Sequence, residues 1–185
     1  MIIYLHGFNS SPQSHKAQLL QRYMAERGLA SSFACPALPP CADGAIRMIE
    51  RAAPPGEVAC YVGSSLGGFY ATYMVERFGG KAVLINPAIE PYADLRTYLG
   101  PQANLYTGER YELTQDHLEQ WRRIAVASIT AQRYLLLVET ADEVLDYRQA
   151  VKRYAGAEQV VIEGGDHSLR SFPQHLDHIL RFAGY

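Results

Sequence analysis

The chain has 185 residues, 48% of them hydrophobic, and its 17 Lys and Arg and 19 Asp and Glu leave a formal net charge of −2. This length and composition favour one globular domain over residues 1–185. The lack of charged runs argues against a nucleic-acid partner. No apolar run approaches the roughly 20 residues that span a bilayer, so we expect no membrane span. The first residues lack the basic region of a signal peptide, so we expect a cytoplasmic protein.

Strand and helix patterns alternate along the chain, which predicts an α/β fold with a doubly wound sheet. Most strand candidates are continuous apolar runs, typical of strands buried on both faces of a parallel sheet. In chain order the predicted strands are Ile2–Leu5, Ser32–Cys35, Val58–Val62, Ala82–Asn86, Tyr134–Glu139 and Gln159–Glu163. The predicted helices between and after them are Ser14–Arg27, Ala42–Ala53 (ending at Pro54-Pro55), Leu66–Phe78, Val144–Tyr154 and Pro173–Phe182.

One segment, residues 87–130, interrupts this alternation. It contains no good strand candidate, several Pro and Gly residues, and one predicted helix over Thr114–Ala127. An insertion of this length is usually functional, so we expect a cap-like insertion over the site. The alternative is an ordinary long helical connection.

The three cysteines, Cys35, Cys41 and Cys60, favour a reducing compartment. Their number is odd and no pair has Cys-x-x-Cys spacing. Inert thiols in the cytosol are the simplest interpretation, and a redox role for Cys35 and Cys41 is the alternative.

The most informative motif is Gly63-Ser64-Ser65-Leu66-Gly67, which matches Gly-x-Ser-x-Gly between a predicted strand and a predicted helix. Glycine at both flanks removes the Cβ clashes that would block a tight turn. Such a turn presents the serine hydroxyl at the carboxyl edge of the sheet, where ligands bind in open α/β folds. The motif therefore predicts that Ser65 is a nucleophile.

A serine nucleophile needs a base, and the base needs an orienting acid, in the chain order serine, acid, histidine. Asp142 follows one predicted strand and His167 follows the next. We therefore expect a Ser65, His167, Asp142 triad, in which His167 moves the proton and Asp142 fixes its tautomer. The alternatives are that Asp142 is only an N-cap of the following helix, and that His167 is an ordinary loop residue. Rival acids are Glu143, Asp146 (expected inside that helix) and Asp166 (expected to make local turn contacts).

The tetrahedral intermediate also needs two hydrogen-bond donors for its oxyanion. The backbone N–H of Leu66, at a helix N-terminus, is the first expected donor. The second is the N–H of Phe8, in the loop that follows the first strand. We expect His6 to orient this loop rather than to do chemistry.

Other kinds of site have weak support. His175 and His178 lie three apart on the last predicted helix with no third ligand, so we expect a solvated face and no metal site. No dinucleotide-binding or phosphate-binding loop is present, so we expect no cofactor.

The whole set of motifs resembles the α/β-hydrolase superfamily and, more narrowly, the small bacterial YqiA-type esterases. The stretches that carry this resemblance run over nearly the whole chain. They are Tyr4–Pro12, Gly63–Gly68, Asn86–Ala88, Thr140–Tyr147 and Gly165–His167.

The resemblance implies six parallel strands in the order 2-1-3-4-5-6, with helices on both faces and a small helical cap. It also implies hydrolysis of carboxylic esters or thioesters, acyl-CoA among them, without a metal or organic cofactor. We expect the acyl chain to lie against Phe8, Leu66 and the cap-like insertion. The remaining substrate-binding candidates are Asn9 (alternatively a turn residue), Tyr92, Leu95 and Tyr98.

Two other functions use the same scaffold. One is a non-catalytic binding protein, although such proteins typically lack a triad member and all three are present here. The other is a serine hydrolase of peptide or carbon–carbon bonds, which the same triad serves.

Overall fold

The computed structural model describes residues 1–52 and 57–185. Six strands in these ranges form one parallel sheet in the order β2-β1-β3-β4-β7-β8, which confirms the predicted fold and strand order. The strands are β1 (Ile2–Leu5), β2 (Phe33–Ala34), β3 (Cys60–Ser64), β4 (Lys81–Ile85), β7 (Tyr134–Glu139) and β8 (Glu158–Ile162).

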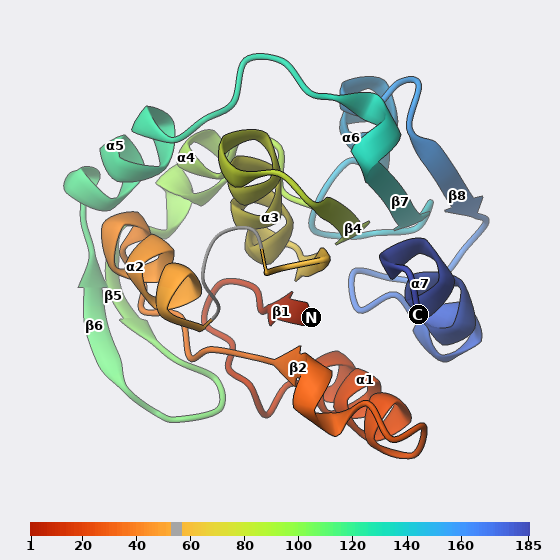
Figure 1. Ribbon diagram of the computed structural model, residues 1–185. Helices are drawn as coiled ribbons and strands as arrows, with labels where there is room; N and C mark the ends of the chain where they lie inside the picture. The colour runs from red at the N-terminus through yellow and green to blue at the C-terminus, as the bar shows by residue number, and fades with distance from the viewer. Residues whose placement is uncertain (53–56) are drawn as a thin grey trace.

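Helices cover both faces of the sheet (Figure 1). Alternate residues of β1 divide between two apolar cores: Ile3 and Leu5 pack with α2 (Ala42–Ala52), α3 (Leu66–Phe78) and α6 (Tyr147–Arg153). Ile2 and Tyr4 pack with α1 (His15–Ala25) and α7 (Leu176–Ala183) on the other face. Both faces of the central strands are therefore buried, as their continuous apolar runs predict. Short 3₁₀ helices precede β2, β7 and α7, at η1 (Ala30–Ser32), η3 (Ala131–Arg133) and η4 (Phe172–His175).

Several element boundaries differ from the sequence prediction. The helix predicted from Val144 begins at Tyr147, because Asp146 is its N-cap and accepts a hydrogen bond from the backbone N–H of Arg148. The helix predicted from Pro173 begins as η4, and α7 starts only at Leu176. The predicted end of the second helix, at Ala53 and Pro54-Pro55, lies outside the described residues.

Segment 87–130 contains a β-hairpin, so the expectation that it holds no strand was wrong. Strands β5 (Gly100–Ala103) and β6 (Arg110–Leu113) pair antiparallel. Gly and Pro in the first of them weaken the local strand signal. The pairing is supported instead by hydrogen bonds between the hairpin and the loop after β1. The segment also contains α4 (Pro91–Asp94), η2 (Leu95–Tyr98) and α5 (Gln115–Arg123).

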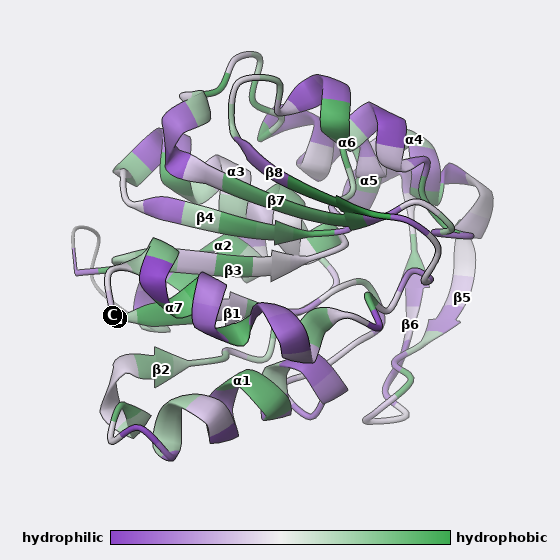
Figure 2. Ribbon diagram, turned by 90° about the vertical axis from the view of Figure 1, so that its right-hand side faces the viewer, coloured by the Kyte–Doolittle hydropathy of each residue, from purple (hydrophilic) through white to green (hydrophobic). Residues whose placement is uncertain are grey.

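The hairpin lies beyond the carboxyl ends of the sheet strands, on the side to which the strand arrows point in Figure 2. That is the edge at which the predicted site residues follow β1, β3, β7 and β8. The action of this segment as a cap stays a prediction. Within the two described ranges, no helix combines the length and apolar character needed to cross a membrane.

Candidate active site

Ser65 occupies a strained turn between β3 and α3. Its φ of 53° and ψ of −120° are rare for a residue with a side chain. The flanking glycines permit this turn, because a Cβ on Gly63 would lie 2.3 Å from the carbonyl oxygen of Gly67. A Cβ on Gly67 would lie 1.9 Å from the carbonyl oxygen of Leu5. The strained strand-to-helix turn predicted from the motif is therefore present.

Backbone hydrogen bonds hold this turn against the next strand. The Ser65 N–H donates to the carbonyl oxygen of Ile85 at 3.0 Å, and the Ala88 N–H donates to that of Ser65 at 3.1 Å. Leu66 is the first residue of α3, so its N–H has no acceptor four residues earlier in the helix. That N–H lies at the positive end of the helix dipole, where an oxyanion is stabilised.

The loop after β1 lies against Ser65. A Cβ on Gly7 would lie 3.3 Å from Ser65 Cβ, so a side chain at position 7 would crowd Ser65. Buried His6 orients the loop as expected: its Nε2 accepts from the Leu38 N–H at 2.9 Å. Its Nδ1 therefore carries the proton and donates to the Gly7 carbonyl oxygen at 3.0 Å. Burial lowers the pKa of His6, so the ring is neutral at pH 7.

The structure brings His167 and Asp142 together. His167 Nδ1 lies 2.9 Å from Asp142 Oδ2 and 3.0 Å from Oδ1. Asp142 Oδ1 also accepts from the backbone N–H groups of Val144 and Leu145, at 2.8 and 2.9 Å. Burial opposes ionisation of Asp142, but the hydrogen bonds from His167 and these two N–H groups outweigh it and lower the pKa. An ionised Asp142 assigns the ring proton to Nδ1 and leaves Nε2 free to act as a base.

The rival acids have other partners. Asp146, not Asp142, caps α6, and Glu143 accepts a hydrogen bond from the backbone N–H of His167. Asp166 makes the local contacts expected of it, with the Ser168 N–H and hydroxyl and, at 2.5 Å, with Arg170 Nε. Of the four acidic side chains, Asp142 is the one that contacts the His167 ring.

Ser65 and His167 follow strands β3 and β8 of the same parallel sheet. Among the hydrogen bonds of the described residues, none joins the Ser65 hydroxyl to the His167 ring. In free enzymes such catalytic hydrogen bonds are often long and tighten only when substrate is bound.

Two residues that the sequence reading missed hold the His167 loop in place. The Asn86 side chain donates to the carbonyl oxygens of Asp166 and His167, both at 3.1 Å. Its Oδ1 accepts from the backbone N–H of Glu139. The Glu139 carboxylate, 1% exposed, accepts from the N–H groups of Asp166, Arg170 and Ser171 at 2.8–3.0 Å. The sequence does contain a signal for both residues, because each is a polar residue at the end of an otherwise apolar strand. Asn86 directly follows β4, and Glu139 is the last residue of β7.

Replacing Glu139 by Gln is expected to lower the free energy of unfolding by about 2–4 kcal/mol, because the amide NH₂ would face a backbone N–H donor. Burial alone would raise the pKa of Glu139, but its hydrogen bonds from Ser171, Asp166 and Arg170 lower it. A carboxyl whose pKa is lower when folded stabilises the protein above its unfolded pKa, and this contribution is lost as pH falls through the folded value. The free energy of unfolding of the wild type should therefore exceed that of Glu139→Gln by the full amount near pH 7, and this difference should shrink below about pH 4.5.

Urea unfolding of wild type and Glu139→Gln, from about pH 7 to about pH 3.5, measures this difference. Glu163→Gln, at an exposed carboxylate, is the matched control and should behave as wild type. A Glu139→Gln deficit of unchanged size across this pH range would show that the carboxylate charge does not stabilise the loop.

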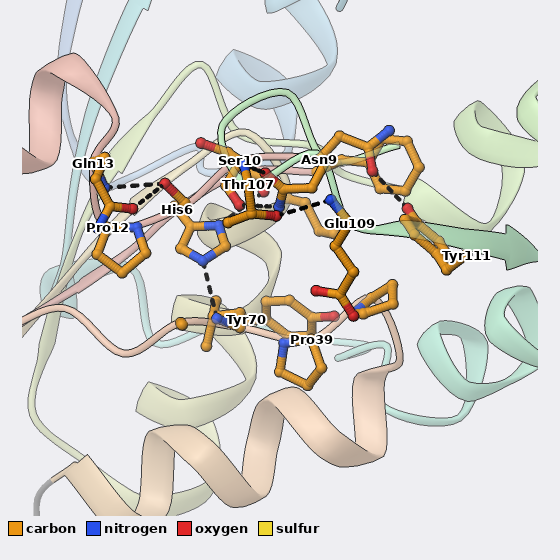
Figure 3. Close-up of a pocket in the computed structure, with 18 residues that line it drawn as sticks. His6, Asn9, Ser10, Pro12, Gln13, Pro39, Tyr70, Thr107, Glu109 and Tyr111 are labelled. Carbon is orange, nitrogen blue, oxygen red and sulfur yellow. Dashed lines mark hydrogen bonds between the residues drawn. The ribbon is translucent and has the colours of Figure 1, made fainter. Parts of the chain in front are cut away.

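Phe8 and Leu66, the residues of the two expected oxyanion donors, line a cavity of about 370 Å³. The hairpin contributes Thr107, Glu109 and Tyr111 to its wall (Figure 3). Ser65, Asp142 and His167 are not among its lining residues. Asn9 also lines it, but both ends of the Asn9 side chain are hydrogen-bonded to the hairpin.

The other substrate-binding candidates do not line this cavity. Tyr92 borders a second cavity, of about 400 Å³, near Arg153 and Tyr154. Leu95 is partly buried against the core, and Tyr98 is half exposed with its ring edge-on to that of Phe8, at 6.4 Å between centroids.

The two histidines of the last predicted helix differ in their surroundings. His178 bonds to Glu158 at 2.7 Å at the surface. His175 is half-buried, and its Nε2 is buried without a hydrogen-bond partner among the described residues, so His175 does not belong to the expected solvated face. No three His, Cys, Asp or Glu side chains within the described ranges are grouped to hold a metal ion. Burial raises the pKa of Cys35 and Cys60 to about 12, which makes both thiols unreactive at pH 7.

Residues 1–184 match the model of a family described as Uncharacterised protein family (UPF0227). The chain belongs to this family. Solved structures with the same fold include a putative hydrolase from Agrobacterium vitis S4, with TM-score 0.75, 20% identity, and coverage of 98% of this chain and 87% of that one. Mouse alpha/beta hydrolase domain-containing protein 10 superposes with TM-score 0.71 at 16% identity, covering 97% and 87% of the two chains. The esterase domain of a Rhodothermus marinus protein gives TM-score 0.69 at 19% identity, covering 98% and 85%.

These likenesses confirm the α/β-hydrolase fold. One fold supports many activities, so the function of this UPF0227 member has to be argued from its site.

Proposed function

We propose that the protein is a serine hydrolase that cleaves carboxylic esters through an acyl-enzyme intermediate. The observation that carries the proposal is the contact of His167 Nδ1 with both Asp142 oxygens. This pair lies at the sheet edge where Ser65 occupies a strained elbow. An imidazole whose Nδ1 is held by an ionised carboxylate is a base at Nε2, which is what a serine hydroxyl needs.

In the proposed reaction Ser65 Oγ attacks the ester carbonyl carbon while His167 Nε2 takes the hydroxyl proton. The negative oxygen of the tetrahedral intermediate is held by the N–H groups of Leu66 and Phe8. His167 then protonates the leaving alcohol, and a water molecule activated by the same ring releases the acid and restores Ser65. Acyl thioesters, acyl-CoA among them, are cleaved by the same steps.

The cavity lined in part by Phe8 and Leu66 supports a preference for small substrates. Its volume of about 370 Å³ is near the lower end of the roughly 300–1,000 Å³ of small-molecule sites. Its wall combines the apolar Phe8 and Leu66 with the polar Thr107 and Glu109. We therefore expect short-chain esters to react faster than long-chain esters.

Two measurements on one preparation test this proposal. A fluorophosphonate probe should label the protein at Ser65 by peptide mapping, and a panel of p-nitrophenyl esters and acyl-CoAs should give the highest kcat/KM with a short ester. Labelling without turnover of any ester or thioester would instead favour a hydrolase of peptide or carbon–carbon bonds. A protein that is not labelled would be a non-catalytic binding protein on this scaffold.

A further inference from the structure

Both ends of the Asn9 side chain bond to the hairpin. Its Oδ1 accepts from the Tyr111 hydroxyl at 2.7 Å (Figure 3), and its Nδ2 donates to Gln102 Oε1 at 3.1 Å. One partner lies on β6 and the other on β5, so a single side chain contacts both strands of the hairpin. These two bonds fix the orientation of the amide, and they leave one N–H and one oxygen lone pair of Asn9 unused.

Backbone groups strengthen the same contact. The Leu105 N–H donates to the carbonyl oxygen of Asn9 at 2.9 Å, and Asn104 Nδ2 donates to that of Ser10 at 2.7 Å. The Phe8 ring packs edge-on against the Tyr111 ring, 6.5 Å between centroids. We call these interactions between Phe8–Ser10 and β5–β6 the loop–hairpin contact.

The backbone of Asn9 explains why asparagine suits this position. Its φ is 51°, in the left-handed region that Asn and Gly adopt most readily. The reversal there sets the direction of the chain directly after Phe8, whose N–H is the expected second oxyanion donor. A hydrogen bond to an oxyanion depends strongly on distance and angle, so the direction of this N–H affects the rate.

We propose that Asn9 is a positioning residue that fixes the Phe8 N–H by tying the oxyanion loop to the β5–β6 hairpin. The proposal rests on the proposed esterase function. It replaces the sequence-based role of Asn9 in binding substrate. It also means that the hairpin and the oxyanion loop move as one body, so displacement of the hairpin would disrupt the oxyanion site.

The test compares Asn9→Gly, which keeps a residue suited to positive φ but removes both side-chain bonds, with Tyr111→Phe, which removes one bond and keeps the ring. Asn9→Gly is expected to lower kcat for a short p-nitrophenyl ester by about 10–100-fold, with KM within about threefold. This loss is smaller than the roughly 10²–10³-fold effect of deleting an oxyanion donor, because the donor is displaced rather than removed. The double variant should be no slower than Asn9→Gly, because both changes remove the same bond.

Tyr106→Phe, at a half-exposed hairpin tyrosine, is the matched control and should keep wild-type kcat and KM. A raised KM with unchanged kcat in Asn9→Gly would overturn the proposal, because it is the signature of a residue that binds substrate and transition state equally.

Amide hydrogen exchange tests the loop–hairpin contact without measuring activity. Asn9→Gly and Tyr111→Phe should both speed exchange at the N–H groups of Phe8 and Leu105. Faster exchange at Leu105 alone would overturn the proposal even if the esterase function stands. Coupled exchange in a wild type without esterase activity would contradict the proposed function but support the contact.

Discussion

Ser65→Ala is expected to lower kcat for ester hydrolysis by about 10⁴–10⁶-fold, because the variant has no nucleophile and retains only binding and the oxyanion donors. The backbone strain at φ 53° is the same for Ala as for Ser, so thermal unfolding should change little. Initial rates with a short p-nitrophenyl ester, measured beside a thermal melt, separate lost chemistry from lost fold.

Ser64→Ala is the matched control for this prediction. Ser64 is the adjacent residue, buried in the last position of β3, and has no role in the proposed chemistry. We expect the rate of Ser64→Ala to stay within a few-fold of wild type. A Ser65→Ala protein that kept a tenth of the wild-type rate would contradict the nucleophile assignment.

Asp142→Asn is expected to lower kcat by about 10⁴-fold while leaving the fold intact. The reason is that Oδ1 of Asp142 accepts hydrogen bonds from the backbone N–H groups of Val144 and Leu145. An asparagine that keeps these two bonds must turn its NH₂ group toward His167 Nδ1. A donor at that place favours the tautomer with the proton on Nε2, which cannot accept the proton of Ser65.

The measurement is kcat and KM for one short ester, with unfolding by urea as the check on stability. Asp142→Ala is a poorer test, because it would also leave the two N–H groups of the turn without their acceptor. Asp166→Asn is the matched control, since Asp166 adjoins His167 in sequence but bonds to Ser168 and Arg170. Equal losses in Asp142→Asn and Asp166→Asn would contradict the assignment of Asp142 as the orienting acid.

Local patterns predicted the sheet well because buried parallel strands and the turns after them are encoded by short segments. The apolar run before Gly63, the flanking glycines and the helix from Leu66 specify the elbow within a few residues. Local patterns predicted the start of the helix after β7 less well. Asp146 is the N-cap, so α6 begins at Tyr147 rather than at Val144. Asp142 therefore lies before the helix and contacts His167.

The hairpin and the support of the His167 loop were not predictable in this way. β5 contains Gly100 and Pro101, and its partner strand is short, so neither has a strong strand signal. In the sequence, Glu139 is an ordinary polar residue at the end of a strand. In the structure, the loop that carries His167 folds over its carboxylate. Its role depends on backbone N–H groups 27 to 32 residues away in the chain.

The sequence by itself determined the α/β class and the positions of Ser65, Asp142 and His167 at strand ends, because each depends on residues close together in the chain. The strand order was implied by the family resemblance and not by any local pattern. Only the tertiary structure decided which acid contacts His167 and that Asn9 contacts the hairpin. Tyr111 and Asn9 are 102 residues apart. A hydrogen bond over that separation depends on how the whole chain packs, which no local pattern specifies.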